Sequence, residues 1–175
     1  RASGANDTAD YEEIVYEGYG PCGVAMVVEC LTDNRNRTAG DLRHYFDKYD
    51  GNMGQPGSVM FMFTRRGYIA IDGEGLDEDQ VMEDALEAGA EDFNSSDGML
   101  EIITDPNKVG AVREALEQKN YHLLTAQPEY YPRTFTSITD EDAMAKMVKL
   151  LEVLEDDDDV QNVWHNLENL PEEDA

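Results

Sequence analysis

Three shortages in this 175-residue chain limit the classes of protein to which it can belong. The only cysteines are Cys22 and Cys30, whose spacing fits neither a CxxC motif nor a disulfide framework, which indicates a reducing compartment such as the cytoplasm. No apolar run approaches the roughly 20 residues of a membrane helix, and no signal peptide is visible. Thirteen basic residues stand against 39 acidic ones, so the average surface, at a formal net charge of −26, repels phosphate. We therefore expect a cytoplasmic globular protein without a membrane partner.

The basic residues that do occur are concentrated in one region. Residues 35–66 have a local balance of +3, while the rest of the chain carries −29. The charged side chains of this region are Arg35, Arg37, Arg43, Lys48, Arg65 and Arg66, against Asp41, Asp47 and Asp50. Any contact of this chain with nucleic acid is expected to come from this region.

The hydrophobic pattern of the first third predicts a hairpin followed by a β-α-β unit. Two strands, Glu12–Tyr16 and Val24–Leu31, flank a glycine-rich turn. A helix capped by Thr38 follows, with apolar residues at helical spacing. The apolar run Ser58–Thr64 is typical of a strand that crosses beneath such a helix, parallel to the strand before it.

The remaining pattern predicts a complete second unit inside the first. Strands and helices alternate as β-α-β-β-α-β over Tyr68–Ala126, which is the order of a ferredoxin-like domain. Gln127–Arg133 is interpreted as a return linker, and Thr134–Ile138 and Val160–Leu167 as strands on either side of a helix. We therefore predict an α+β fold of two ferredoxin-like βαββαβ units, one inserted into the other. The expected boundaries are 11–66 plus 129–170 for the split domain, 67–128 for the inserted domain and 171–175 for an acidic tail.

Patterns that suggest catalytic or cofactor sites each lack an essential feature. Gly18–Gly23 spells G-x-G-x-x-G, but the next segment favours a strand, whereas a dinucleotide site needs a helix there. The three histidines have no partner at metal spacing, and no serine or cysteine has a base beside it in the sequence. We therefore expect no catalytic residue, no metal and no cofactor.

The arginines, by contrast, are placed where an anion could bind. Arg35 and Arg37 lie where a strand ends and a helix begins, beside the backbone N–H groups at Thr38. A second arginine pair follows the next strand, and loops after two parallel strands emerge at the same edge of a sheet. The predicted anion-binding or nucleic-acid-binding residues are Arg35, Arg37, Thr38, Arg43, Arg65 and Arg66. The alternative is that these arginines form surface ion pairs with the protein's own carboxylates.

Four motifs carry a resemblance to a known family. They are YEGYGP at Tyr16–Pro21, LTDNRNRTA at Leu31–Ala39, GSV at Gly57–Val59 and DDVQNVWHN at Asp158–Asn166. Through them the chain resembles the YebC/PmpR family over nearly its whole length. Cys22 replaces a usual glycine, and Trp164 replaces a common tyrosine.

The resemblance implies a cytosolic, non-enzymatic regulator of gene expression, in bacteria a DNA-binding transcriptional regulator. Mitochondrial members are translational activators, so a ribosome-associated translation factor that binds RNA or ribosomal proteins is the alternative. The resemblance also implies a basic N-terminal helical domain, of which residues 1–10 would be the tail. The chain would then be a monomeric fragment whose intact protein meets DNA, RNA or the ribosome mainly through that domain. A second class of function is a protein-interaction module whose acidic face binds a basic partner.

Overall fold

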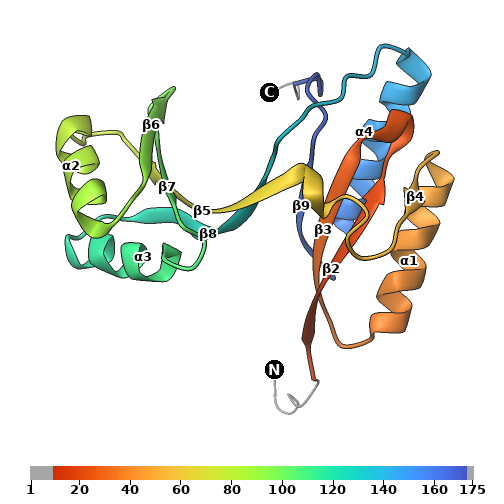
Figure 1. Ribbon diagram of the computed structural model, residues 1–175, viewed down its shortest axis with the longest axis horizontal. Helices are drawn as coiled ribbons and strands as arrows, with labels where there is room; N and C mark the ends of the chain where they lie inside the picture. The colour runs from red at the N-terminus through yellow and green to blue at the C-terminus, as the bar shows by residue number, and fades with distance from the viewer. Residues whose placement is uncertain (1–9, 173–175) are drawn as a thin grey trace. The chain divides into compact units, whose positions relative to one another are not determined.

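The computed structural model describes residues 10–172, which divide into two compact units. Within the described residues, unit 1 comprises the chain up to Phe63 and again from Pro132, and unit 2 comprises Thr64–Tyr131 (Figure 1). Each unit has its own sheet and its own hydrophobic core.

Unit 1 is built on the hairpin that the sequence predicts. Strands β2 (Glu12–Tyr19) and β3 (Ala25–Thr32) pair antiparallel, with Tyr16 opposite Val28. The short strand β4 (Asn52–Met53) pairs with β2, and β9 (Val160–His165) pairs with β3, which gives the order β4-β2-β3-β9. The hairpin turn contains the 3-10 segment Pro21–Gly23, in which Cys22 adopts a φ of 60°. A side chain rarely adopts that backbone conformation, and glycine adopts it without cost.

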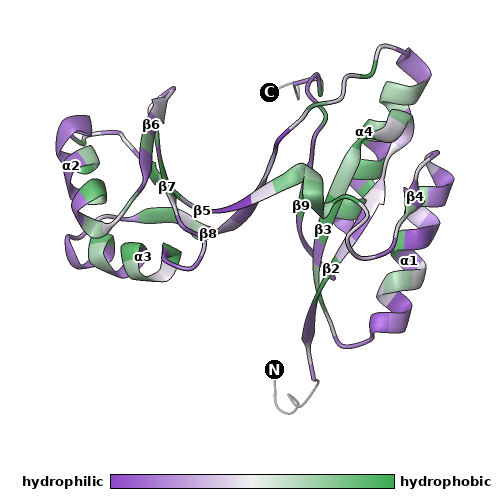
Figure 2. Cartoon of the chain, viewed as in Figure 1, coloured by the Kyte–Doolittle hydropathy of each residue, from purple (hydrophilic) through white to green (hydrophobic). Residues whose placement is uncertain are grey.

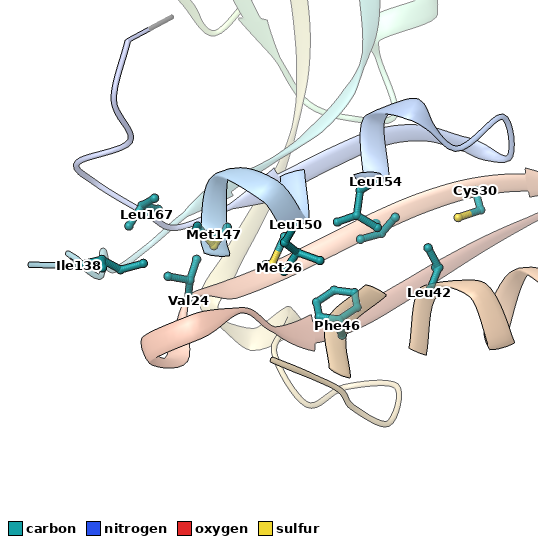
Figure 3. Packing of buried hydrophobic residues seen from close by; sticks show 11 residues of the cluster. Val24, Met26, Cys30, Leu42, Phe46, Ile138, Met147, Leu150, Leu154 and Leu167 are labelled. Atoms are coloured by element: carbon teal, nitrogen blue, oxygen red, sulfur yellow. The ribbon is translucent and has the colours of Figure 1, made fainter. Parts of the chain in front are cut away.

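Two helices, α1 (Arg35–Lys48) and α4 (Glu141–Asp156), supply the rest of the core of unit 1. Leu42 and Phe46 lie four residues apart in α1 and are fully buried, as helical spacing requires of a core-facing stripe. Figure 3 shows these two side chains together with those of α4 and β3 that fill the core, including Met26, Cys30, Met147, Leu150 and Leu154.

Unit 2 follows the predicted β-α-β-β-α-β order. Its elements are β5 (Phe63–Asp72), α2 (Glu78–Ala88), β6 (Asp92–Ser96), β7 (Met99–Thr104), α3 (Val109–Gln118) and β8 (Leu123–Pro132). The strand order is β6-β7-β5-β8. Both helices carry their hydrophobic side toward the sheet (Figure 2), where Val81, Val112 and Leu116 bury against Ile69 and Ile102.

The strand predicted at Ser58–Thr64 is wrong over most of its length. Strand β5 begins only at Phe63 and belongs to the sheet of unit 2, while residues 57–62 form turns and a 3-10 segment at Met60–Met62. The cause is the buried carboxylate of Glu17, which accepts hydrogen bonds from the backbone N–H groups of Gly57 (2.7 Å), Val59 (3.0 Å) and Met60 (2.8 Å). Backbone N–H groups that bind a side chain cannot also pair with a neighbouring strand.

Two further predictions after residue 126 are wrong. Gln127–Arg133 is not a linker, because β8 continues to Pro132 as the edge strand beside β5. Edge strands tolerate proline, since one side of their backbone needs no ladder partner. Thr134–Ile138 is not a strand but makes a single parallel bridge, Thr136 to Leu167.

The fold class is confirmed. Residues 10–172 form a mixed α+β structure with two four-stranded sheets and four α-helices, consistent with two ferredoxin-like units, one interrupted by the other.

Candidate nucleic-acid interface

Helix α1 begins earlier than its sequence predicts, and its first turn is basic. The N-cap is Asn34, whose side chain accepts a hydrogen bond from the backbone N–H of Arg37 at 3.1 Å, so the predicted cap Thr38 lies inside the helix. The first turn contains Arg35 and Arg37 and no acidic residue. The helix dipole disfavours cations at this end by roughly 0.3–1 kcal/mol each. Helix stability therefore does not explain the two arginines.

Arg37 is held by two carboxylates. Its Nη2 donates to both oxygens of Asp159, at 3.2 and 3.0 Å, and to Asp33 at 3.2 Å. The hydrogen bond to Asp159 is the main cause that raises the pKa of Arg37 above its ordinary value. The ion-pair alternative thus describes Arg37, although 46% of its side chain remains exposed.

Thr38 reinforces the same junction from inside the unit. It is fully buried, and its hydroxyl lies 2.8 Å from Asp159 Oδ2 and 2.8 Å from Thr32 Oγ1. Because the carboxylate only accepts, the Thr38 hydroxyl donates to Asp159. Thr38 therefore ties the start of α1 to the start of β9 and does not itself reach solvent.

Arg35 and Arg43 are the accessible arginines of α1. Arg35 approaches Glu12 at 3.5 Å, with 64% and 47% of the two side chains exposed, which is a weak contact in water. Arg43 is exposed and makes no ion pair with any residue of the described range 10–172. Either guanidinium can donate hydrogen bonds to a phosphate.

Gly40, which the sequence analysis did not single out, lies on the exposed side of α1. It stands three residues after Arg37 and three before Arg43, and a Cβ built on it would meet nothing within 4 Å. Packing does not require glycine here, although glycine in a helix interior costs about 1 kcal/mol relative to alanine. A bare stretch of backbone between arginines permits close approach of another backbone. The only signal in the sequence is a glycine inside a helical pattern.

Arg65 and Arg66 lie in the other unit, on β5. Arg66 pairs with Glu91 at 2.6 Å, whereas Arg65 is exposed without an ion pair to any residue between 10 and 172. The parallel strand pair used to predict a shared edge does not exist, because β3 and β5 belong to different sheets. The structure therefore brings Arg35, Arg37, Thr38 and Arg43 together on α1 and places Arg65 and Arg66 on β5.

The side of α1 next to α4 is unsuitable for anions. An open hollow of about 370 Å³ is lined there by Arg37, Asp41 and the run Asp156–Asp159. Five carboxylates around one guanidinium repel phosphate. Arg35, Gly40 and Arg43 do not line this hollow.

Other chemistry-bearing residues do not form a site. The described part of the chain contains no group of three or more histidine, cysteine or acidic side chains that could hold a metal. Burial, and secondarily Asp157, raises the pKa of the Cys30 thiol to about 12, which keeps it protonated. Burial lowers the pKa of His165, whose Nδ1 accepts from the backbone N–H of Leu167 at 3.1 Å. Among the described helices, none is long and apolar enough to span a bilayer.

Comparison with known proteins identifies the family. The family model described as "TACO1/YebC second and third domain" matches residues 11–167. Proteins of Finegoldia magna and Caldicellulosiruptor bescii, each called "Probable transcriptional regulatory protein", are 55% identical to the chain. These matches cover 97% and 96% of the chain and 70% and 69% of the two relatives. A crystal structure of a conserved hypothetical protein from Aquifex aeolicus aligns with a TM-score of 0.81 at 41% identity, covering 98% of the chain and 70% of that protein.

The combination of two interleaved α+β units with these matches defines the class. The chain belongs to the TACO1/YebC family and corresponds to its second and third domains.

Proposed function

We propose that this chain is part of a cytoplasmic transcriptional regulator that binds DNA and acts by binding, not by catalysis. Two relatives that are 55% identical carry the name "Probable transcriptional regulatory protein", which supports regulation of transcription. The regulator acts as a monomer in this proposal. Because this chain has a net charge of −26 and repels phosphate, the regulator meets its target mainly through basic surface outside this chain.

The observation that carries the proposal is the exposed side of α1. Arg35 and Arg43 contact phosphates, and the bare backbone at Gly40, three residues before Arg43, lets the nucleic-acid strand come close. Arg37 and Thr38 hold the helix start in place through Asp159. Arg65 and Arg66, on β5 of unit 2, are proposed as a separate group of phosphate contacts. Such contacts position a phosphate backbone without reading its sequence.

A salt titration of DNA binding tests this proposal. The probe is a labelled 20-base-pair duplex, and fluorescence anisotropy measures its binding. The titration starts at low salt, because the net charge of −29 outside residues 35–66 weakens binding by this chain. The double variant R35A/R43A removes two phosphate contacts, so the slope of log K against log salt should flatten by about two units for all duplex sequences.

The matched control is R113A/K149A, which removes the same charge from two exposed helix positions elsewhere. The control should lower affinity slightly and leave the slope near that of the parent. Equal slopes for the parent and R35A/R43A would contradict the proposal. Binding to ribosomes or RNA with no affinity for duplex DNA would replace it by a role in translation.

A further inference from the structure

Strand β9 forms an open edge of the sheet in unit 1 (Figure 1). It is the last strand in the order β4-β2-β3-β9, and among residues 10–172 no further strand pairs with it. The backbone N–H of Asn166 donates to the carbonyl of Ala25 beside β3 at 3.1 Å. Antiparallel strands bond through alternate residues, so Val163 and His165 turn their N–H and C=O groups away from β3. These backbone groups are therefore open to a further strand.

Two hollows lie beside this edge, next to α4. One, of about 220 Å³, has an apolar lining that includes Val148 and Leu151 of α4, Val163 of β9 and the 39% exposed Leu170. The other, of about 280 Å³, follows the first half of β9. Val163 and Glu155 line both, so the two hollows adjoin. Because successive side chains of a strand point to opposite faces, a strand paired with β9 would direct every second side chain into these hollows.

The carboxylates beside the hollows make this edge acidic. Glu152 and Glu155 of α4 belong to the lining, and Glu155 makes no ion pair with any residue between 10 and 172. Glu152 approaches Lys149 at 3.6 Å, with 57% and 64% of the two side chains exposed, which is a weak contact in water. The run Asp156–Asp159 follows directly after Glu155. The edge therefore attracts positive charge and repels phosphate and acidic surfaces.

We infer that the open edge of β9 binds an extended basic segment of another protein. The segment pairs with Val163 and His165 as an added strand, places alternate apolar side chains in the hollows and sets lysine or arginine beside Glu155. Main-chain hydrogen bonds give such strand addition its affinity, and the side chains in the hollows give its specificity. A second copy of this chain fits poorly, because two β9 edges that meet antiparallel turn Glu152 and Glu155 of each copy toward the other. The contact uses β9 and α4 and is independent of the DNA contact proposed for α1.

The test uses the full chain and a fluorescein-labelled eight-residue peptide of alternating lysine and valine, measured by anisotropy at low salt. Glu155→Lys exchanges an exposed ion pair for a repulsion of similar size, so the affinity should fall about fivefold. The matched control, Glu114→Lys, makes the same charge change at an exposed position of α3 and should stay within about twofold of the parent. A peptide of the same composition with all lysines before all valines should bind more weakly, because its valines cannot occupy alternate positions.

Hydrogen exchange gives a second readout that charge attraction alone would not change. The amides of Val163 and His165 should exchange about tenfold more slowly in the complex, whereas those of Asn162 and Trp164, already paired with β3, should change little. Equal losses of affinity in E155K and E114K, or binding that leaves the Val163 and His165 amides unprotected, would overturn the inference. Absence of peptide binding at low salt, or dimers of the chain formed through β9 in sedimentation, would also overturn it. The R35A/R43A titration tests the proposed function separately from each of these outcomes.

Discussion

Each unit contains a hydrogen bond from a tyrosine to an aspartate, but the sequence separation of the two residues differs greatly between the units. In unit 1 the hydroxyl of Tyr45 donates to Asp157 at 2.8 Å across 112 residues, whereas in unit 2 the hydroxyl of Tyr121 donates to Asp84 at 2.6 Å across 37 residues. Unit 1 closes only when its second segment returns, while unit 2 closes within one continuous stretch. Loop closure over a longer chain costs more entropy, so unit 1 depends more heavily on such contacts.

The long-range contacts of unit 1 also distinguish an arginine that holds the fold together, Arg37, from one that is exposed to a ligand, Arg35. The long-range contacts of unit 1 include Arg37 and Thr38 with Asp159, and they stand at the start of α1 beside Arg35. In unit 2 the corresponding carboxylate, Asp84, joins α2 to Lys119 and Tyr121 after α3. A polar network at a helix start can position a binding surface, whereas one between two helices only fastens them.

The largest expected effect is on the contact that closes unit 1. Replacing Asp159 by alanine leaves the buried Thr38 hydroxyl without its carboxylate acceptor and should lower the free energy of unfolding by about 2 kcal/mol. Urea denaturation measures this. Asp158→Ala, at the exposed neighbour, should change stability by less than about 0.5 kcal/mol. Equal losses in the free energy of unfolding would show that Asp159 stabilises unit 1 no more than an exposed aspartate does.

In unit 2 the matching carboxylate, Asp84, can be tested through the dependence of stability on acidic pH. The hydrogen bonds from Tyr121, and then from Lys119, lower the pKa of Asp84, so its contribution to stability is present above about pH 4 and is lost as the pH drops through the folded-state value. Asp84→Asn should therefore reduce stability at neutral pH and make the loss of stability between about pH 5 and 2 shallower. Urea curves at a series of pH values test this, with exposed Glu83→Gln as the control.

A smaller effect, common to the two units, is expected from their buried tyrosines in alkali. Burial, followed by the hydrogen bond to its aspartate, raises the pKa of Tyr45 and of Tyr121 to about 12. Their contribution to stability is complete below about pH 10 and is lost as the pH rises toward 12. Tyr45→Phe and Tyr121→Phe should each remove one late-titrating phenol from the absorbance titration at 295 nm. A late phase that neither substitution alters would be inconsistent with both hydrogen bonds.

The sequence predicted unit 2 better than unit 1 for the same physical reason. The strands and helices of unit 2 form within one stretch, so the periodicity of Val81, Val112 and Leu116 is enough to place them. In unit 1 the segment after Gly57 bonds to the side chain of Glu17, and no local pattern reveals that a carboxylate 40 residues away satisfies its backbone. The apolar run after Gly57 therefore resembles a strand in the sequence, although Glu17 already binds several of its backbone N–H groups.

The candidate interface was predictable only in part. Charge counting located the arginines of α1, but it could not distinguish Arg37 from Arg35, because the partner of Arg37 lies 122 residues later. The placement of Arg65 and Arg66 failed because it relied on a parallel strand pair that the sheet of unit 1 lacks. Gly40 required the structure, since only the space around it shows that packing does not demand glycine.

One substitution tests the central claim, that the exposed side of α1 is kept bare for a nucleic-acid backbone. Gly40→Ala should raise the free energy of unfolding by about 0.5–1 kcal/mol, because alanine favours the helix and its methyl group meets open space. The same methyl group should weaken duplex DNA binding, because it stands between Arg37 and Arg43 where the strand approaches. Urea denaturation and anisotropy on one protein sample measure both quantities. We predict higher stability with lower affinity; higher stability with unchanged affinity would contradict the claim.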